Sequence, residues 1–219
     1  MLIQAFLQLT PAIFTLFYHS ALAKTSEKKA DDLSLSFILG VEVFHAIIFL
    51  SVFSIISWAI SSPHFETEIL NWILAGIFGA LSVASFFYYF RSRGTELFIP
   101  RKIAKNLTTR AKNLKTRSDA WVLGFFAGVP ELLFTLPLFM ICSLTALKFA
   151  GLSTPTIIIL YILVATVPLF ILRALFRGGL NLADIQRLRV KNKSFFRLTI
   201  TLGYLFLAFL IIANGVNLL

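Results

Sequence analysis

Residues 121–147 are the stretch that most restricts the fold of this sequence, because they are apolar over a length that matches a lipid bilayer. About 20 helical residues, rising 1.5 Å each, cross a hydrocarbon core of roughly 30 Å. Glu131 interrupts this run directly after Pro130, and Pro137 follows two turns later. Proline breaks the helical hydrogen-bond pattern, so we expect an interrupted helix with free carbonyls beside an acidic side chain. An ionisable residue at this depth usually has a functional role.

Five further apolar segments of similar length accompany this one. They cover residues 2–23, 33–60, 69–90, 156–176 and 195–218. The chain has 58% hydrophobic and 14% charged residues, which is the composition of a polytopic membrane protein. The sequence therefore predicts an all-α integral membrane protein with six transmembrane helices.

The positive charges predict the orientation of these helices. All but Lys148 of the 20 Lys and Arg residues fall within residues 24–29, 91–117 and 173–197, whereas the loop at 61–68 contains two glutamates and no Lys or Arg. Basic residues mark cytoplasmic loops, so we expect both termini outside, an N-out/C-out topology. Such a pattern is typical of a bacterial or archaeal inner (plasma) membrane, where we expect the protein to reside.

The central basic loop has helical periodicity of its own. Between residues 99 and 118, Ile103, Leu107, Ala111 and Leu114 recur at helical spacing. This pattern is typical of an amphipathic cytoplasmic helix that lies on anionic lipid headgroups, with a cytoplasmic partner as the alternative. No base-stacking pattern accompanies the charge, so we do not expect nucleic acid as a partner. The predicted lipid-contacting residues are Lys102, Lys105, Arg110, Lys112, Lys115 and Arg117.

The basic loop divides the chain into two halves of three helices. We place the first half at 1–95, the linker at 96–120 and the second half at 121–219. An odd number of helices per half gives the halves opposite orientations, as in the inverted repeats of many secondary transporters. Phe-Thr-Leu begins three residues after Pro11 in the first half and four residues after Pro130 in the second, so the two spacings differ by one residue. Paired proline-interrupted helices point to a central binding site.

This layout resembles the lysine-exporter (LysE/CcdA-like) superfamily of six-helix inverted-repeat membrane proteins. The resemblance covers nearly the whole chain through its helix order, the prolines Pro11 and Pro130, and the basic loop between the halves. It departs from the thiol-carrying cytochrome c biogenesis branch, in which a cysteine stands beside each proline, because Cys142 is the single cysteine here. The resemblance implies an exporter of amino acids, metals or small ions.

Glu42 and His45 form a second polar pair within an apolar segment. Residues three apart share one face of a helix, and Glu-x-x-His pairs occur in metal sites of helical bundles. The same pair also suits a proton relay, because histidine titrates near neutrality. A hydrogen-bonded pair that joins two helices is a third interpretation.

The depth of Glu42 in its segment matches that of Glu131. Each lies roughly 14 Å from the predicted cytoplasmic end of its helix, at 1.5 Å per residue. Two carboxylates in one cavity repel unless a proton or a cation joins them, so we expect a cationic partner. The predicted substrate or ion site contains Glu131, Glu42, His45, Pro11 and Pro130, and a metal is one candidate for Glu42, His45 and Glu131.

Glycine pairs offer places where helix backbones could meet. Gly124 and Gly128 have the GxxxG spacing, and Gly76 and Gly79 lie within the third segment. Small residues allow close helix packing. The alternative for Gly124 and Gly128 is a hinge beside Pro130.

These features together predict a small secondary transporter or exporter of a cation or a small amphipathic metabolite. The alternative is a membrane assembly or accessory factor that does not transport and whose basic loops dock a partner. We expect no enzyme activity, because hydrolase, zinc-protease and nucleotide-binding motifs are missing from the sequence. We expect no cofactor, and the expected partners are the bilayer, the small substrate, and either a second copy, as a homodimer, or a membrane-complex partner.

Overall fold

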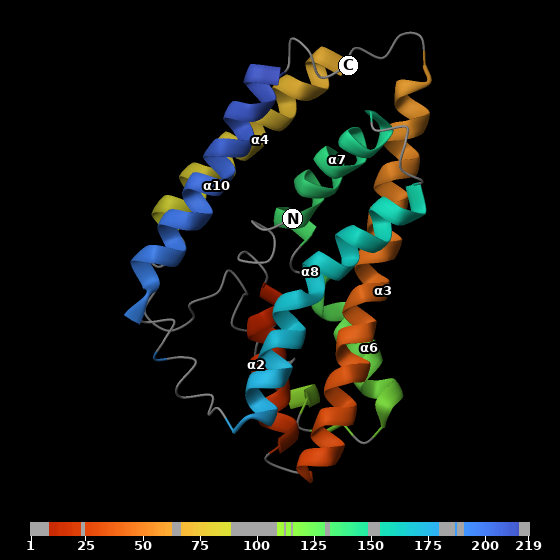
Figure 1. The fold of residues 1–219 in the computed structure, drawn as a ribbon, viewed down its shortest axis with the longest axis vertical. Coiled ribbons are helices and arrows are strands. Elements are labelled where there is room, and N and C mark those ends of the chain that lie inside the picture. The colour runs from red at the N-terminus through yellow and green to blue at the C-terminus, as the bar shows by residue number, and fades with distance from the viewer. Residues whose placement is uncertain are drawn as a thin grey trace.

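The described part of the chain is helical throughout. The computed structural model describes residues 9–22, 25–62, 67–88, 109–111, 113–114, 116–129, 132–148, 154–179, 187 and 191–214. Its helices are α2 (Leu9–Leu22), α3 (Glu27–Ile60), α4 (Thr67–Tyr88), α6 (Arg117–Ala127), α7 (Leu132–Lys148), α8 (Thr154–Arg177) and α10 (Lys193–Asn214) (Figure 1). Since no strand occurs among these residues, the predicted all-helical class is confirmed for them.

Helix α3 is the centre of the structure. It has 34 residues and packs against α2, α6, α7 and α8. Figure 1 shows it as the long orange helix, with α6 along its lower half. At 1.5 Å per residue α3 is about 51 Å long, more than a bilayer core needs. The helix therefore has room for polar residues at its ends and an apolar middle.

The α3 and α6 backbones touch at two glycines. A Cβ atom added to Gly40 would collide with the Trp121 carbonyl oxygen, and one added to Gly124 would collide with the Phe37 carbonyl oxygen. Gly124 therefore serves close packing, one of the two interpretations open for it. Among the described residues, nothing lies within 4 Å of a Cβ atom added to Gly76 or Gly79 of α4, so the prediction that these glycines allow close packing is wrong there.

The predicted interruption of residues 121–147 is observed. Helix α6 ends at Ala127, Gly128 forms its C-cap, and α7 begins at Leu132. The ring of Phe44 lies where a side chain at Gly128 would be, so this end of α6 lies beside α3. Pro130 and Glu131, at the interruption itself, lie outside the described residues.

Helices α4 and α10 form a pair that packs mainly on itself. The Ser82 hydroxyl of α4 donates to the Thr201 carbonyl of α10 at 2.9 Å, and Phe78 and Tyr204 are both buried at the contact. Of the described helices in the rest of the molecule, α7 makes the main contact with the pair through α4. In Figure 1 the pair lies to the left of the other helices.

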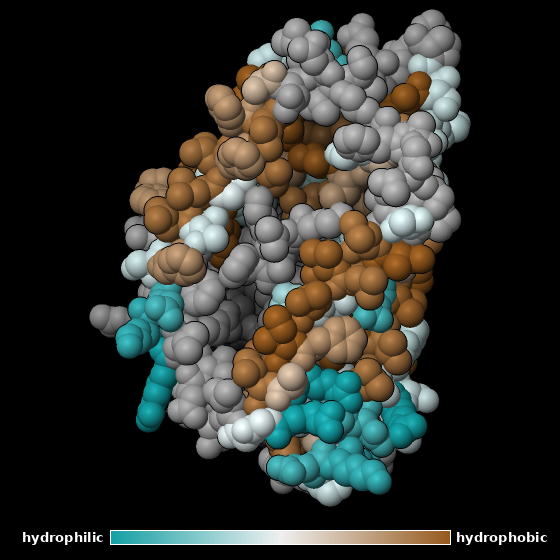
Figure 2. Space-filling view, in the orientation of Figure 1, coloured by the Kyte–Doolittle hydropathy of each residue, from teal (hydrophilic) through white to brown (hydrophobic). Residues whose placement is uncertain are grey.

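Among the described residues, three helical stretches are long and apolar enough to cross a membrane, at Glu27–Ile60, Glu68–Phe87 and Ile159–Arg177. Two shorter apolar stretches are Thr135–Leu147 and Leu198–Ala213. Figure 2 shows hydrophobic side chains over the middle and upper parts of the visible face and hydrophilic ones at its lower end. The protein thus has the helices of an integral membrane protein. The six spans, their inverted repeat and their orientation stay predictions.

The predicted loop helix at 99–118 is not continuous. Residues 109–111 are helical, Asn113 closes a turn onto Arg110, and Thr116 caps the start of α6. The Thr116 side chain accepts from the Asp119 backbone N–H while Asp119 accepts from the Thr116 N–H, a capping box that begins a new helix. The linker predicted to end at residue 120 therefore already contains the first turn of α6.

Candidate functional site

Glu42 lies in the middle of α3 and faces α8. Its side chain is half-buried and makes a polar contact with the Thr166 hydroxyl of α8. Thr166 is fully buried, and its hydroxyl donates to the Ile162 carbonyl at 2.9 Å, the back-bond open to threonine in a helix. An acid and a hydroxyl from different helices thus meet at the centre of the molecule.

His45 follows Glu42 by one turn and lies within electrostatic range of its carboxylate. The imidazole is fully buried, and its ring centre is 6.0 Å from that of Phe139 on α7. Phe139 in turn contacts Tyr161 of α8 at 5.2 Å. The structure therefore brings the predicted pair together on one side of α3, at the junction of α3, α7 and α8.

The interrupted helix approaches this junction from α6. Gly128 packs against Phe44, which directly precedes His45 in the chain. Glu131 and Pro130 lie outside the described residues, so the predicted match in depth between Glu131 and Glu42 stays a prediction. Pro11 is the third residue of α2, where the missing backbone N–H is tolerated. Its side chain also lies outside the described ones.

The metal interpretation gains no third ligand from the described residues. Within them, no group of three or more His, Cys, Asp or Glu side chains is close enough to hold a metal ion. Glu42 and His45 alone are a carboxylate and an imidazole beside a hydroxyl, which suits a proton or a monovalent or organic cation. The three-ligand set with Glu131 stays a prediction, since Glu131 lies outside the described residues.

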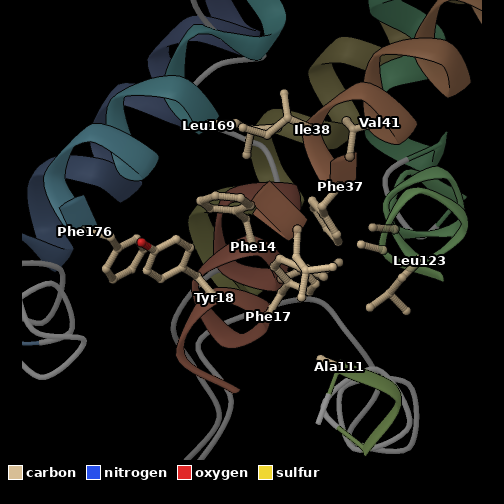
Figure 3. Close-up of a cluster of buried hydrophobic side chains, with 14 residues drawn as sticks. Phe14, Phe17, Tyr18, Phe37, Ile38, Val41, Ala111, Leu123, Leu169 and Phe176 are labelled. Atoms are coloured by element: carbon tan, nitrogen blue, oxygen red, sulfur yellow. The ribbon is translucent and has the colours of Figure 1, made fainter. Parts of the chain in front are cut away.

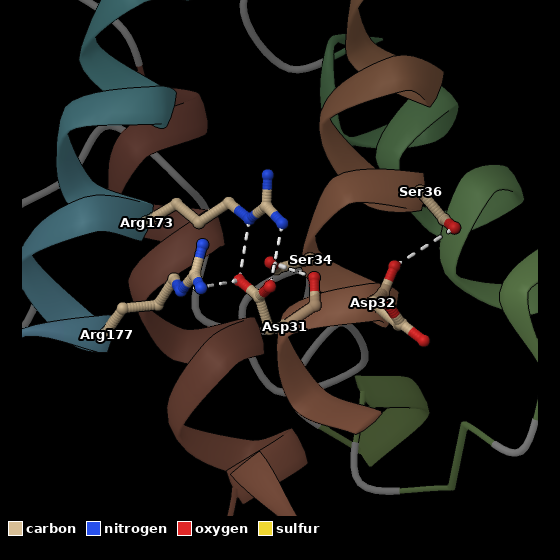
Figure 4. Close-up of polar contacts among 6 residues, drawn as sticks. All are labelled: Asp31, Asp32, Ser34, Ser36, Arg173 and Arg177. Carbon is tan, nitrogen blue, oxygen red and sulfur yellow. Dashed lines mark hydrogen bonds and ion pairs between the residues drawn. The ribbon is translucent and has the colours of Figure 1, made fainter. Parts of the chain in front are cut away.

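Two ion pairs at the lower end of α3 were not predicted. The Arg173 guanidinium of α8 donates to Asp31 through Nε at 2.7 Å and Nη2 at 2.8 Å, and Arg177 lies 4.0 Å from the same carboxylate (Figure 4). Arg117, at the start of α6, donates to the neighbouring Asp32 at 2.7 Å. Adjacent acids of α3 thus bind two different helices of the second half.

The two pairs differ in their exposure to solvent. The side chains of Arg173 and Asp31 are 18% and 20% exposed, whereas those of Arg117 and Asp32 are 71% and 45% exposed. Bidentate geometry and partial burial make the Asp31 pair the stronger of the two. The sequence signal was available, since both acids stand just before an apolar segment and Arg173 ends another, but nothing in it specifies the pairing.

An aromatic cluster fills the same end of the molecule. Phe14, Phe17 and Tyr18 of α2 are buried against Phe37 of α3 and Phe176 of α8 (Figure 3). Ring centres lie 4.7 Å apart for Phe17 and Phe37, and 4.6 Å apart for the parallel rings of Tyr18 and Phe176. This cluster closes the space between α2, α3 and α8 with apolar surface.

The basic loop contributes to this cluster as well. Ala111 is buried in it, and Leu114 packs against it. Part of the predicted amphipathic face therefore contacts the protein itself and not lipid. Among the predicted lipid-contacting residues, Arg110 is exposed and Arg117 pairs with Asp32. The other four, Lys102, Lys105, Lys112 and Lys115, lie outside the described residues.

Comparison with known proteins found no relative of this chain. No family model matches the chain, and neither a curated protein nor a solved structure does. The resemblance to the lysine-exporter superfamily therefore depends on the layout of the sequence alone and stays a prediction.

Proposed function

We propose that this chain is a small secondary transporter that moves a cation past Glu42. The proposal rests on Glu42, whose half-buried carboxylate lies in the middle of a membrane-length helix, in contact with Thr166 and beside His45. An acid in this position is costly to insert into a membrane, and such residues usually face a partner or a watery path. A cation or a proton is the natural partner for it.

The arrangement of helices supports an inverted repeat of three plus three spans. In such a repeat α3 corresponds to α8 and α4 to α10, and each of these two pairs packs together. The contact of α2 with α8 then corresponds to that of α7 with α3, and the contact of α2 with α3 to that of α7 with α8. A two-fold axis in the membrane plane would produce these matched contacts. The contact of α4 with α7 has no counterpart of similar extent between α10 and α2 among the described residues.

The charge distribution supports the orientation. The lower end of the molecule, where α3 and α6 begin and α8 ends, carries the hydrophilic side chains seen in Figure 2. Lys28 and Lys29 are exposed there, together with Arg177. We therefore assign this end to the cytoplasm, which places both chain termini outside.

Flux measurements on the purified full chain test the proposal. Proteoliposomes loaded with a pH-sensitive dye are offered radiolabelled lysine, methylammonium or Mn²⁺, three probes of the expected cation classes. We expect one of them to move, and Glu42→Gln to lower its rate by about tenfold or more, equivalent to ~1.4 kcal/mol in the barrier. Glu68→Gln, which removes an exposed acid at the start of α4, is the matched control and should keep the wild-type rate.

The alternative is an assembly or accessory factor, and one observation favours it. His45 is fully buried between the rings of Phe44 and Phe139, a packing that also suits a purely structural histidine. This alternative predicts no flux of any probe through the wild-type chain. It also predicts a larger native complex that dissociates when exposed basic residues such as Arg110 and Arg187 are neutralised.

A further inference from the structure

We infer that the Asp31–Arg173 ion pair and the Tyr18–Phe176 stack form a gate that closes the cytoplasmic route to Glu42. This inference rests on the proposed function and adds its regulation: opening the site toward the cytoplasm requires α8 to separate from α2 and α3. The neighbouring Asp32–Arg117 pair is not part of the gate.

The position of the gate follows from the residues along one face of α8. Thr166, Leu169, Arg173 and Phe176 recur at helical spacing and therefore share that face. Thr166 contacts the site, Leu169 is fully buried beside Ile38 and Val41 of α3, and Arg173 binds Asp31 (Figure 3). Seven residues of helix, about 10 Å, separate Thr166 from Arg173. A path from the cytoplasm along the contact between α3 and α8 must pass the ion pair first.

The aromatic stack closes the adjoining contact between α2 and α8. The Tyr18 and Phe176 rings are nearly parallel, with an interplanar angle of 12°, and Tyr18 is 2% exposed. Phe176 lies one turn beyond Arg173, so the stack and the ion pair act on the same turns of α8. Arg177 reinforces the pair from 4.0 Å away. Both contacts would be lost together if this end of α8 moved outward.

Asp32 has a different role because α3 and α6 form one body. Gly40 and Gly124 bring their backbones into direct contact, and the Asp32–Arg117 pair joins the same two helices at their beginnings. Loss of the Asp32 pair would therefore leave the α3 to α8 contact in place. Two adjacent acids of one helix thus provide a gate variant and its matched control.

A thiol-accessibility experiment tests the gate without knowledge of the substrate. The only cysteine of the chain is removed by Cys142→Ala, and Thr166→Cys is added as a reporter on α8. Sealed inside-out membrane vesicles expose the cytoplasmic face to the small cationic reagent MTSET, which does not cross the bilayer. We expect slow labelling with Asp31 and Arg173 intact. In Asp31→Asn or Arg173→Gln we expect about tenfold faster labelling. Either substitution removes a charge-assisted contact that favours the closed state of the gate over the open one.

The control variants make the result specific. Asp32→Asn should label at the rate of the unmodified gate, and the exchanged pair Asp31→Arg with Arg173→Asp should restore slow labelling. If Asp31→Asn and Arg173→Gln label no faster than Asp32→Asn, the gate is refuted. Should the two gate variants not reach the membrane, Arg177→Gln replaces them, with about threefold faster labelling expected from the weaker contact. An unchanged rate in Arg177→Gln then refutes the gate.

The outcome separates the gate from the proposed transport. If Glu42→Gln lowers cation flux while Asp31→Asn leaves the labelling rate unchanged, the transporter proposal is supported and the gate is refuted. If labelling responds to Asp31 while no cation depends on Glu42, the conformational change stands and the transported species has been misassigned.

Discussion

Asp31 and Arg173 lie 142 positions apart in the sequence, yet their side chains join α3 to α8 through hydrogen bonds of 2.7 and 2.8 Å. The contact links a helix of the first half to a helix of the second half at the end that carries the basic residues.

The Asp31–Arg173 pair should contribute measurably to stability. Because both side chains are about four-fifths buried, Asp31→Ala leaves a largely buried guanidinium without the carboxylate that it binds. We expect a loss of about 1–3 kcal/mol in the free energy of unfolding, the usual cost of an unsatisfied buried charged partner. Thermal unfolding of the detergent-solubilised chain measures it. Glu27→Ala, an exposed acid of the same helix end, should unfold at the wild-type temperature, and equal midpoints for the two variants would contradict the prediction.

Thr166 should affect flux more than stability. Thr166→Val keeps the shape of the side chain and removes the hydroxyl that contacts Glu42. We expect cation flux to fall by about threefold to tenfold, which corresponds to the net loss of one hydrogen bond of about 0.5–1.5 kcal/mol. Thr145→Val removes a hydroxyl that makes the same kind of back-bond, to Ile141 at 2.8 Å, on the exposed side of α7. Its flux should be unchanged, and a comparable fall in both variants would mean that the Thr166 hydroxyl has no special role.

Substituting glycine by alanine should lower stability where the glycine touches a neighbouring backbone, as at Gly124, and not where it has no close neighbour, as at Gly76. Gly124→Ala places a methyl group against the Phe37 carbonyl, which is backbone and has no rotamer with which to move away. We expect a loss of about 1–3 kcal/mol or more, as for overpacking. Gly76→Ala meets nothing within 4 Å and should leave stability unchanged or raise it by up to about 1 kcal/mol. Unfolding midpoints ranked in the opposite order would contradict the packing of α3 on α6.

The orientation can be measured with two cysteines at the ends of α3. Ser26 precedes the helix and Ser62 follows it, and both are exposed. In a Cys142→Ala background, we expect an impermeant maleimide to label Ser26→Cys in inside-out vesicles and Ser62→Cys in intact cells or right-side-out vesicles. Labelling of each cysteine from the opposite side would reverse the topology and place the Asp31 pair outside.

Much of the fold could be predicted because apolar length and proline act locally. The segment at 33–60 corresponds to α3, the segment at 156–176 to α8, and the interruption at Pro130 separates α6 from α7. The Glu42 and His45 pair was identified from spacing alone, and the structure places it at a helix junction. Apolar length, proline and residue spacing were therefore enough to predict features that lie within a single helix.

The rest depends on contacts between distant segments. Asp31 and Asp32 looked like ordinary acids at a helix end, since their partners lie far along the chain. The glycines could not be sorted by sequence either, because Gly76 and Gly124 differ only in what lies opposite each of them. The sequence predicts a continuous loop helix because the apolar spacing extends to Leu114, but a capping box at Thr116 starts another helix two residues later.

The backbone contact between Gly40 and α6 has a consequence for how a membrane crossing could bend. Since the helix is broken after Gly128, its first piece, α6, meets α3 backbone to backbone at Gly40, whereas its second piece, α7, meets α3 through side chains such as Phe139 beside His45. Side chains can change rotamer and backbone carbonyls cannot, so we expect any bending of this crossing to displace α7 more than α6.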